Sequence, residues 1–85
     1  MNIAYSKSLL KQSKKLNPQI KQKLSERIGL FCQNPLHPDL RNHALKGKYK
    51  EYRSIDISGD VRTLYLIQDD IIIFDIIGTH SELYG

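Results

Sequence analysis

The sequence has few cysteines and no long apolar run, and each absence excludes a class of protein. One cysteine, Cys32, cannot form a disulfide framework, which excludes a small disulfide-bonded secreted domain. No run of about 18 apolar residues is present, which excludes a membrane-spanning helix. The N-terminal stretch lacks the basic-then-apolar order of a secretory signal. We therefore expect a cytoplasmic protein without membrane association, in which Cys32 is a buried helix thiol.

Cofactor motifs are missing as well. The His, Cys, Asp and Glu residues do not occur at metal-ligand spacings, and no glycine-rich phosphate loop is present. Repeats, low-complexity tracts and linkers are also absent. We therefore expect neither a metal nor another cofactor. At 85 residues the chain forms a single domain, residues 1–85, with an economical core.

Charge is plentiful and unevenly distributed. Residues 1–55 hold twelve Lys or Arg and three Asp or Glu, a net charge of +9, whereas residues 56–85 hold one Arg and six acids, a net charge of −5. A basic half beside an acidic half is typical of a protein that approaches a polyanion with one side. A nucleic acid and an acidic protein both fit as that partner. For any single lysine the alternative is a merely solvated helix face.

Two helices are predicted in the basic half. A serine N-cap followed by leucines at roughly helical spacing predicts a helix over residues 6–15. Asn17 as N-cap and Pro18 at the first helical position begin a second helix, over residues 18–33. An apolar stripe predicts that this helix packs one face on a sheet: Ile20, Leu24, Ile28, Phe31 and Cys32.

Strands are predicted at the start of the chain and throughout its second half. A short strand covers residues 2–5, and alternating segments predict three antiparallel strands: 49–57, 61–67 and 71–77. A two-residue turn at Ser58-Gly59 would direct Ile55, Ile57, Leu64 and Leu66 to the helices, and Tyr52, Ser54, Asp56, Thr63 and Tyr65 outward. The third of these strands is apolar on both faces apart from Asp75 and is expected to be central or covered. The element order β-α-α-β-β-β predicts an α+β fold, with two N-terminal helices on a small antiparallel sheet.

The histidines differ in their surroundings. His37 lies between Leu36 and Pro38, where we expect a polar surface group without a catalytic role. His80 follows a glycine at the exit of a strand, where a side chain can be aimed across a sheet face. The same segment has the S/T-x-x-E form of a capping box, and the two interpretations are compatible because a cap would fix the backbone that aims His80. Asp60 is by default a turn residue at a hairpin tip.

Two segments together carry a family resemblance. The stretch HALKGKYKEYRSIDISGDVRTLYLI, followed by DDIIIFDIIGTHSELYG, resembles the RelE/ParE superfamily of bacterial toxins, and within it the YafQ-type branch of messenger-RNA interferases. The specific features are the NHALKG segment, the YR that opens the first hairpin strand, the aspartate at the hairpin turn and the terminal GTHSELYG. The resemblance spans residues 1–85 and implies a RelE-like fold.

The resemblance also implies a function. It indicates the toxin of a type II toxin–antitoxin system, acting as a ribosome-dependent, metal-independent endoribonuclease that cuts mRNA in the 30S decoding site beside 16S rRNA and inhibits translation. It implies a cognate antitoxin, a hetero-oligomeric complex, and binding to operator DNA through the antitoxin. Two alternatives stay open: a ParE-like inhibitor of DNA gyrase without nuclease activity, and a degenerate homologue acting only with its antitoxin.

Site residues follow from the resemblance position by position. It implies catalytic roles for His43 and Asp60, a proton-donor role for His80, and contact with a base for Tyr84. Arg62 matches an arginine of the RelE branch, and Asp56 stands where YafQ relatives can carry a histidine. Strict alternation directs Asp56 and Arg62 to opposite faces, so we rank both below the other catalytic candidates. The predicted RNA-binding residues are Tyr84, Arg53, Lys46, Lys48 and Lys50.

These residue types suit RNA cleavage without a metal. The reaction removes a proton from a 2′-OH, stabilises charge on the phosphorus oxygens and protonates the leaving 5′-oxygen. An imidazole generally titrates near pH ~6.5, so it can donate or accept a proton at neutral pH and contribute ~10²–10⁴-fold in rate. Arginine or lysine can stabilise the phosphorane charge, and a tyrosine can stack on an unpaired base.

Overall fold

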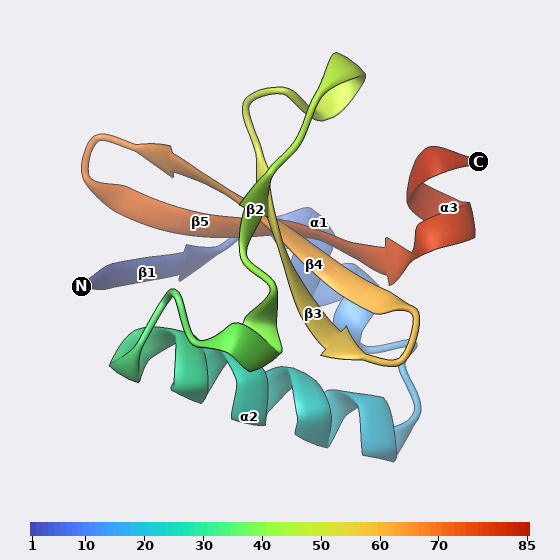
Figure 1. Ribbon diagram of the computed structural model, residues 1–85. Helices are drawn as coiled ribbons and strands as arrows, with labels where there is room; N and C mark the ends of the chain where they lie inside the picture. Colours follow the sequence, from blue (N-terminus) through green and yellow to red (C-terminus); the bar gives the residue numbers. More distant parts are fainter.

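A five-stranded mixed sheet is the frame of the protein, whose computed structural model describes residues 1–85 (Figure 1). The strands are β1 (Asn2–Tyr5), β2 (His43–Ala44), β3 (Arg53–Ser58), β4 (Val61–Gln68) and β5 (Ile71–Thr79). Their spatial order is β1-β5-β4-β3-β2, so β5 is an interior strand with a neighbour on each side. The expectation of a wholly antiparallel sheet is wrong at one edge, where β1 runs parallel to β5. Parallel neighbours require a long crossover connection, and the elements between β1 and β5 provide it.

Three α-helices and two short 3₁₀ turns complete the chain. They are α1 (Lys7–Ser13), α2 (Pro18–Gln33), η1 (Pro38–Leu40), η2 (Gly47–Tyr49) and α3 (His80–Tyr84). Both predicted helices and their caps are confirmed, because the Ser6 and Asn17 side chains each accept a hydrogen bond from the backbone three residues on. The first helix ends two residues earlier than predicted. No helix combines the length and apolar character needed to cross a bilayer.

The hydrophobic core lies between the sheet and the α1–α2 layer. It is formed by Leu9, Leu24, Ile28, Phe31, Leu40, Ile55, Ile57, Tyr65, Phe74 and Ile77. Phe31 is at its centre, with its ring edge-on to the rings of Tyr65 at 5.0 Å and Phe74 at 5.3 Å. The prediction that Cys32 is buried is wrong, because its side chain is exposed. The buried face of α2 is narrow, and Cys32 lies about 100° around the helix from Phe31.

The β3–β4 hairpin has a different register from the predicted one. Gly59 and Asp60 form the turn, with Gly59 in the left-handed region at φ 49°. Asp56 pairs with Arg62 and Ser58 with Val61, so Ile57 is an extra, bulged residue. A shift of one residue exchanges the two faces of a strand.

The predicted face assignment is therefore wrong for β4. Thr63 pairs with Ile55, so Thr63 and Tyr65 share the helix-covered face, and Tyr65 is buried in the core. Leu64 and Leu66 alternate with them and face the other way.

A second bulge lies in the β4–β5 pair. Leu64 pairs with Ile76 and Tyr65 with Phe74, which leaves Asp75 unpaired between them. The Tyr52 hydroxyl donates a hydrogen bond of 2.6 Å to an Asp75 carboxylate oxygen. The extra residue thus gives a strand that is otherwise apolar one polar anchor.

Phe31 and Cys32 are adjacent residues that should differ sharply in their effect on stability. We expect Phe31→Ala to lower the free energy of unfolding by about 3–5 kcal/mol, because it leaves a cavity between α2 and the sheet. Cys32→Ala should change it by less than about 0.5 kcal/mol, since the thiol is exposed. Urea denaturation followed by circular dichroism measures both. A comparable loss in the two variants would contradict the core described above.

Candidate active site

The side chains that can do chemistry gather on the sheet face opposite α2. Asp56 and Arg62 stand on β3 and β4 with their side chains directed away from the core, since their neighbours Ile55, Ile57 and Thr63 face the helices. Figure 1 shows α3 and the loop that contains η2 bordering this side of the sheet.

Helix α3 is fixed by a capping box, as the sequence predicts. The Thr79 hydroxyl accepts from the Glu82 N–H at 3.2 Å, and a Glu82 carboxylate oxygen accepts from the Thr79 N–H at 2.8 Å. These hydrogen bonds hold the pKa of the exposed Glu82 carboxyl below its ordinary value. Gly78 continues β5 without a positive φ, so the change of direction comes from the cap and not from the glycine. Buried Leu83 holds the helix against the protein.

The start of α3 is tied to the hairpin turn. The His80 N–H donates to the Asp60 carbonyl oxygen at 3.2 Å, which brings two predicted site residues together. The Asp60 side chain is exposed and makes no hydrogen bond or ion pair of its own. The Asp60 backbone therefore contacts the backbone of His80, and the Asp60 side chain is open to solvent.

An aromatic row follows from His80. The centroid of its ring lies 4.7 Å from that of Tyr84. The Tyr84 ring packs edge-on against Tyr49 at 5.8 Å between centroids, and Tyr49 packs edge-on against Tyr52 at 6.0 Å. The Lys48 ammonium lies 5.0 Å above the Tyr49 ring. Burial raises the pKa of the Tyr84 phenol, and the positive charge of Arg62 acts on it in the opposite direction. Arg62 pairs with Gly78 near the end of β5, two residues before His80, so the polar residues on the sheet adjoin this row.

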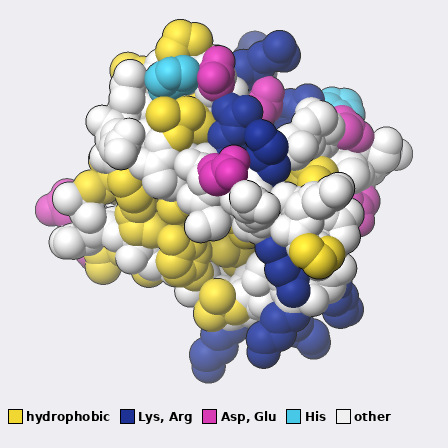
Figure 2. Space-filling view, turned by 90° about the horizontal axis from the view of Figure 1, so that it is seen from below, with side chains coloured by type: hydrophobic (Ala, Val, Ile, Leu, Met, Phe, Trp, Pro, Cys, Tyr) yellow, Lys and Arg dark blue, Asp and Glu magenta, His cyan; other side chains and the backbone are white.

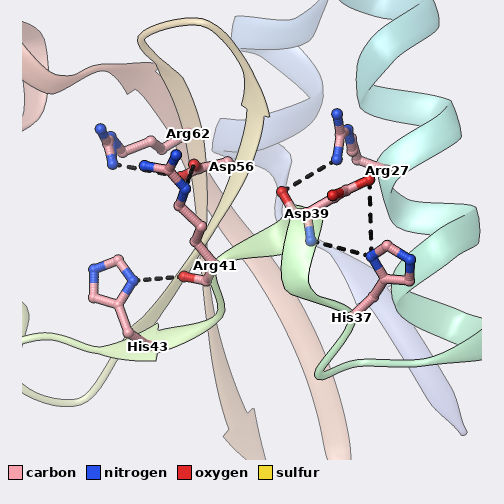
Figure 3. A network of polar contacts seen from close by, with 7 residues as sticks. All are labelled: Arg27, His37, Asp39, Arg41, His43, Asp56 and Arg62. Carbon is pink, nitrogen blue, oxygen red and sulfur yellow. Dashed lines mark hydrogen bonds and ion pairs between the residues drawn. The ribbon is translucent and has the colours of Figure 1, made fainter.

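A carboxylate shared by two arginines is the second part of the site (Figure 3). Asp56 lies 3.4 Å from Arg62 Nη1 through one oxygen and 3.6 Å from Arg41 Nε through the other. The prediction that Asp56 and Arg62 face opposite ways is wrong, because the Ile57 bulge restores them to one face. The reason for ranking them below the histidines and Asp60 is therefore removed.

His43 adjoins this cluster through the backbone of Arg41. Its Nδ1 lies 2.6 Å from the Arg41 carbonyl oxygen, a contact drawn as a dashed line in Figure 3. A carbonyl can only accept, so Nδ1 carries a proton and the neutral ring leaves Nε2 with a free lone pair. The ring is exposed, so this nitrogen is available to a ligand.

Other predicted residues lie elsewhere. Arg53 shares the core-side face of β3 and donates from Nε to Asn42 Oδ1 at 2.9 Å, so it holds the loop before β2. Lys46, Lys48 and Lys50 are exposed around η2. His37 belongs to a separate cluster in Figure 3, where its Nδ1 accepts from the Asp39 N–H at 3.1 Å. Because that N–H can only donate, His37 is a neutral cap of η1, and its Nδ1–Asp39 carboxylate contact of 3.9 Å is not an ion pair.

Three contributors were missed by the sequence reasoning. Arg41 lies in the loop before His43 and carries no motif. Tyr49 stands beside a predicted RNA-binding lysine, which is the only signal in its favour. Asp75 interrupts an apolar strand, and a buried-strand pattern broken by one carboxylate was the available sign of a bulge.

The helix-covered side of the protein is mainly apolar and carries fewer candidate catalytic side chains. Figure 2 shows an apolar patch on this side, with Lys and Arg side chains gathered along one edge. A hollow of about 300 Å³ between α1 and α2 is lined mainly by Tyr5, Leu9, Leu10, Leu24 and Ile28. No group of three or more His, Cys, Asp or Glu side chains in the protein is arranged to hold a metal ion.

Comparisons with known proteins agree with one another. The family described as "Bacterial toxin of type II toxin-antitoxin system, YafQ" matches residues 1–85. The mRNA interferase toxin YafQ of Escherichia coli K12 is 32% identical over 65 residues, which are 74% of this chain and 71% of that protein. The crystal structure of YafQ from E. coli BL21(DE3) has a TM-score of 0.82 at 28% identity, covering 99% of this chain and 98% of that one. A chain of the E. coli DinJ–YafQ toxin–antitoxin complex has a TM-score of 0.78 at 30% identity, with 99% and 97% covered.

The Tyr52–Asp75 hydrogen bond raises the pKa of Tyr52 from 10.0 to about 12. We therefore expect an ultraviolet titration of the folded protein to show a last step near pH 12, which comes from Tyr52. A raised pKa means that this contribution to stability is present below pH 10.0 and is lost as the pH rises towards 12.

Tyr52→Phe should abolish the last titration step, and Asp75→Asn should lower its pH. Tyr5→Phe, which alters an exposed phenol, is the matched control and should leave the step in place. An unchanged last step in Tyr52→Phe would contradict the assignment.

Proposed function

We propose a function from one premise: the chain belongs to the YafQ family of toxins from bacterial type II toxin–antitoxin systems. It is an mRNA interferase, an endoribonuclease that cuts messenger RNA and so inhibits translation. The observation that supports the proposal best is that His80, Tyr84, Arg62, Asp56 and His43 gather on one face of the sheet. Those side chains supply a proton donor, a base-stacking ring, a phosphate-binding cation and a proton acceptor.

The proposed reaction is a transfer within the RNA that needs no metal ion. His43 Nε2 accepts the proton of the 2′-OH, and the 2′-oxygen attacks the adjacent phosphorus. The bond from phosphorus to the 5′-oxygen breaks, and the His80 imidazolium donates its proton to that oxygen. The products are a 2′,3′-cyclic phosphate and a 5′-hydroxyl, so protons and electrons balance. Each positioned acid or base contributes ~10²–10⁴-fold.

The other residues act on charge and position. Arg62 stabilises the additional negative charge on the phosphorus oxygens, and Asp56 holds its guanidinium. The ring of Tyr84 stacks on a nucleobase next to the scissile bond. Asp60, whose backbone is bonded to His80, is the carboxylate available to orient that histidine or to take a proton.

The proposed partners follow from the family. The substrate is mRNA in the decoding site of the small ribosomal subunit, next to 16S rRNA, and the setting is the cytoplasm. E. coli YafQ was crystallised with DinJ as a toxin–antitoxin complex, so the protein partner proposed here is a cognate antitoxin. The complex would be hetero-oligomeric and would bind operator DNA through the antitoxin.

His80 should be the principal proton-transfer group. We expect His80→Ala to lower cleavage of mRNA on purified ribosomes by ~10²-fold or more, the scale of a lost general acid. His80→Ala should also remove the limb of the pH–rate profile that the acid produces. Circular dichroism checks the fold, which should persist because the ring is exposed and the cap of α3 is made by Thr79 and Glu82.

His37→Asn is the matched control, because asparagine keeps a side-chain acceptor for the cap of η1. It should cleave at the wild-type rate. A folded His80→Ala variant with near wild-type cleavage would remove His80 from the mechanism. A wild type that arrests growth without cutting RNA would support the gyrase-inhibitor alternative instead.

The three lysines around η2 should contact phosphates. We expect ribosome binding to weaken steeply with salt, with a log–log slope of about −0.7 to −0.9 for each neutralised phosphate. Replacing Lys46, Lys48 and Lys50 together by Gln should flatten that slope by about 2. The triple variant of Lys11, Lys14 and Lys15, which removes the same charge from the other side, should flatten it less. Equal effects would show that only net charge matters.

A further inference from the structure

Arg41 and Arg62 share one carboxylate at the edge of a polar cleft. The cleft has a volume of about 440 Å³ and runs along the sheet edge past η1 and the β3–β4 turn, from Asp56 and Arg62 to Arg27 of α2. Arg62 approaches one Asp56 oxygen at 3.4 Å and Arg41 approaches the other at 3.6 Å. Figure 3 shows the Arg41 side chain reaching from the loop before β2 across to the two strand residues.

The charges in this cleft are incompletely balanced. Arg27, Arg41 and Arg62 face two carboxylates, Asp39 and Asp56. Arg27 donates to the Asp39 backbone carbonyl at 3.2 Å and makes no ion pair. The Arg62 Nε is buried and has no hydrogen-bond partner within the protein. A guanidinium has five N–H donors, so most of those in the cleft are unused.

The backbone directs Arg41 to this place. Its φ of 47° is in the left-handed region, which residues other than glycine adopt rarely and at a cost. Two contacts hold it there: the Arg41 N–H donates to the Pro38 carbonyl at 3.2 Å, and His43 Nδ1 donates to the Arg41 carbonyl at 2.6 Å. The Arg41 side chain is still 79% exposed, against 20% for Asp56. Hydrogen bonds therefore fix the Arg41 backbone, while its guanidinium group is accessible to a ligand.

We propose that Arg41 is a phosphate-binding residue, which grips a backbone phosphate of single-stranded RNA together with Arg62. Asp56 occupies this place in the free protein, and the incoming phosphate displaces it from Arg41. Guanidinium groups match phosphate oxygens in two parallel hydrogen bonds, whereas the 3.6 Å ion pair that the largely exposed Arg41 makes with Asp56 contributes little free energy and exchanges readily. The inference rests on the proposed function, because it assumes RNA as the ligand.

The test measures binding of a 2′-O-methyl RNA oligonucleotide, which has no 2′-OH to react. Fluorescence anisotropy at several salt concentrations gives affinity and log–log slope. We expect Arg41→Gln to lower affinity about tenfold and the slope by about 0.7. Arg41→Lys should recover part of the affinity, since lysine keeps the positive charge but lacks the paired N–H donors of the guanidinium group. Asp56→Asn should bind more tightly than wild type, because it frees both guanidinium groups.

Lys11→Gln removes one exposed charge from α1 and is the control, with an expected change of less than about twofold. Arg41→Gln that binds with wild-type affinity and slope would overturn the proposal, and so would Asp56→Asn that binds more weakly. A wild type that does not bind the oligonucleotide at low salt would overturn it too. A wild type that shows the Arg41 effect but cuts no mRNA on ribosomes would overturn the proposed function and leave the phosphate site standing.

Discussion

One extra residue in the β3–β4 hairpin determines which side chains meet on the open face. Ile57 is bulged into the core, so Asp56 pairs directly with Arg62 and both point away from the helices. The same shift directs Tyr65 inward, where its ring contacts Phe31 and its hydroxyl bonds to Asn42 in the loop before His43. A single bulge therefore brings Arg62 beside Asp56, packs Tyr65 into the core and anchors the loop that carries Arg41 and leads into His43.

The site is assembled from weakly buried parts that are each fixed by a different device. A capping box orients His80, an aromatic row supports Tyr84, and a left-handed backbone directs Arg41. His80, Tyr84 and Arg41 are exposed to solvent, whereas Asp56 and Arg62 are half-buried. An exposed ligand-binding surface on a rigid sheet suits a large polyanion, because the protein needs to present donors and not to enclose the substrate.

Much of this arrangement could be predicted from the sequence. The caps at Ser6 and Asn17, the helix pattern and the capping box are local signals, and all were confirmed, as was the family. The face assignment of β4 and the parallel position of β1 were not predictable in this way. A bulge changes no residue type, and a parallel edge strand depends on contacts with residues far along the chain. The prediction that Cys32 is buried was wrong for a related reason, because the sheet that α2 packs on determines how wide the buried face of the helix is. The catalytic roles of the histidines remain predictions.

The pairing of β1 with β5 has a consequence for the order of events during synthesis. Asn2 is aligned with Ile71 and Tyr5 with Phe74, so the first strand finds its only neighbour in the sheet among residues far along the chain. Contacts so distant in sequence form slowly and cannot form on a nascent chain that lacks one partner. Helix α3 and the sheet face it borders depend on the same late strand. During translation the candidate site can therefore assemble only after residues 71–79 have left the exit tunnel of the ribosome.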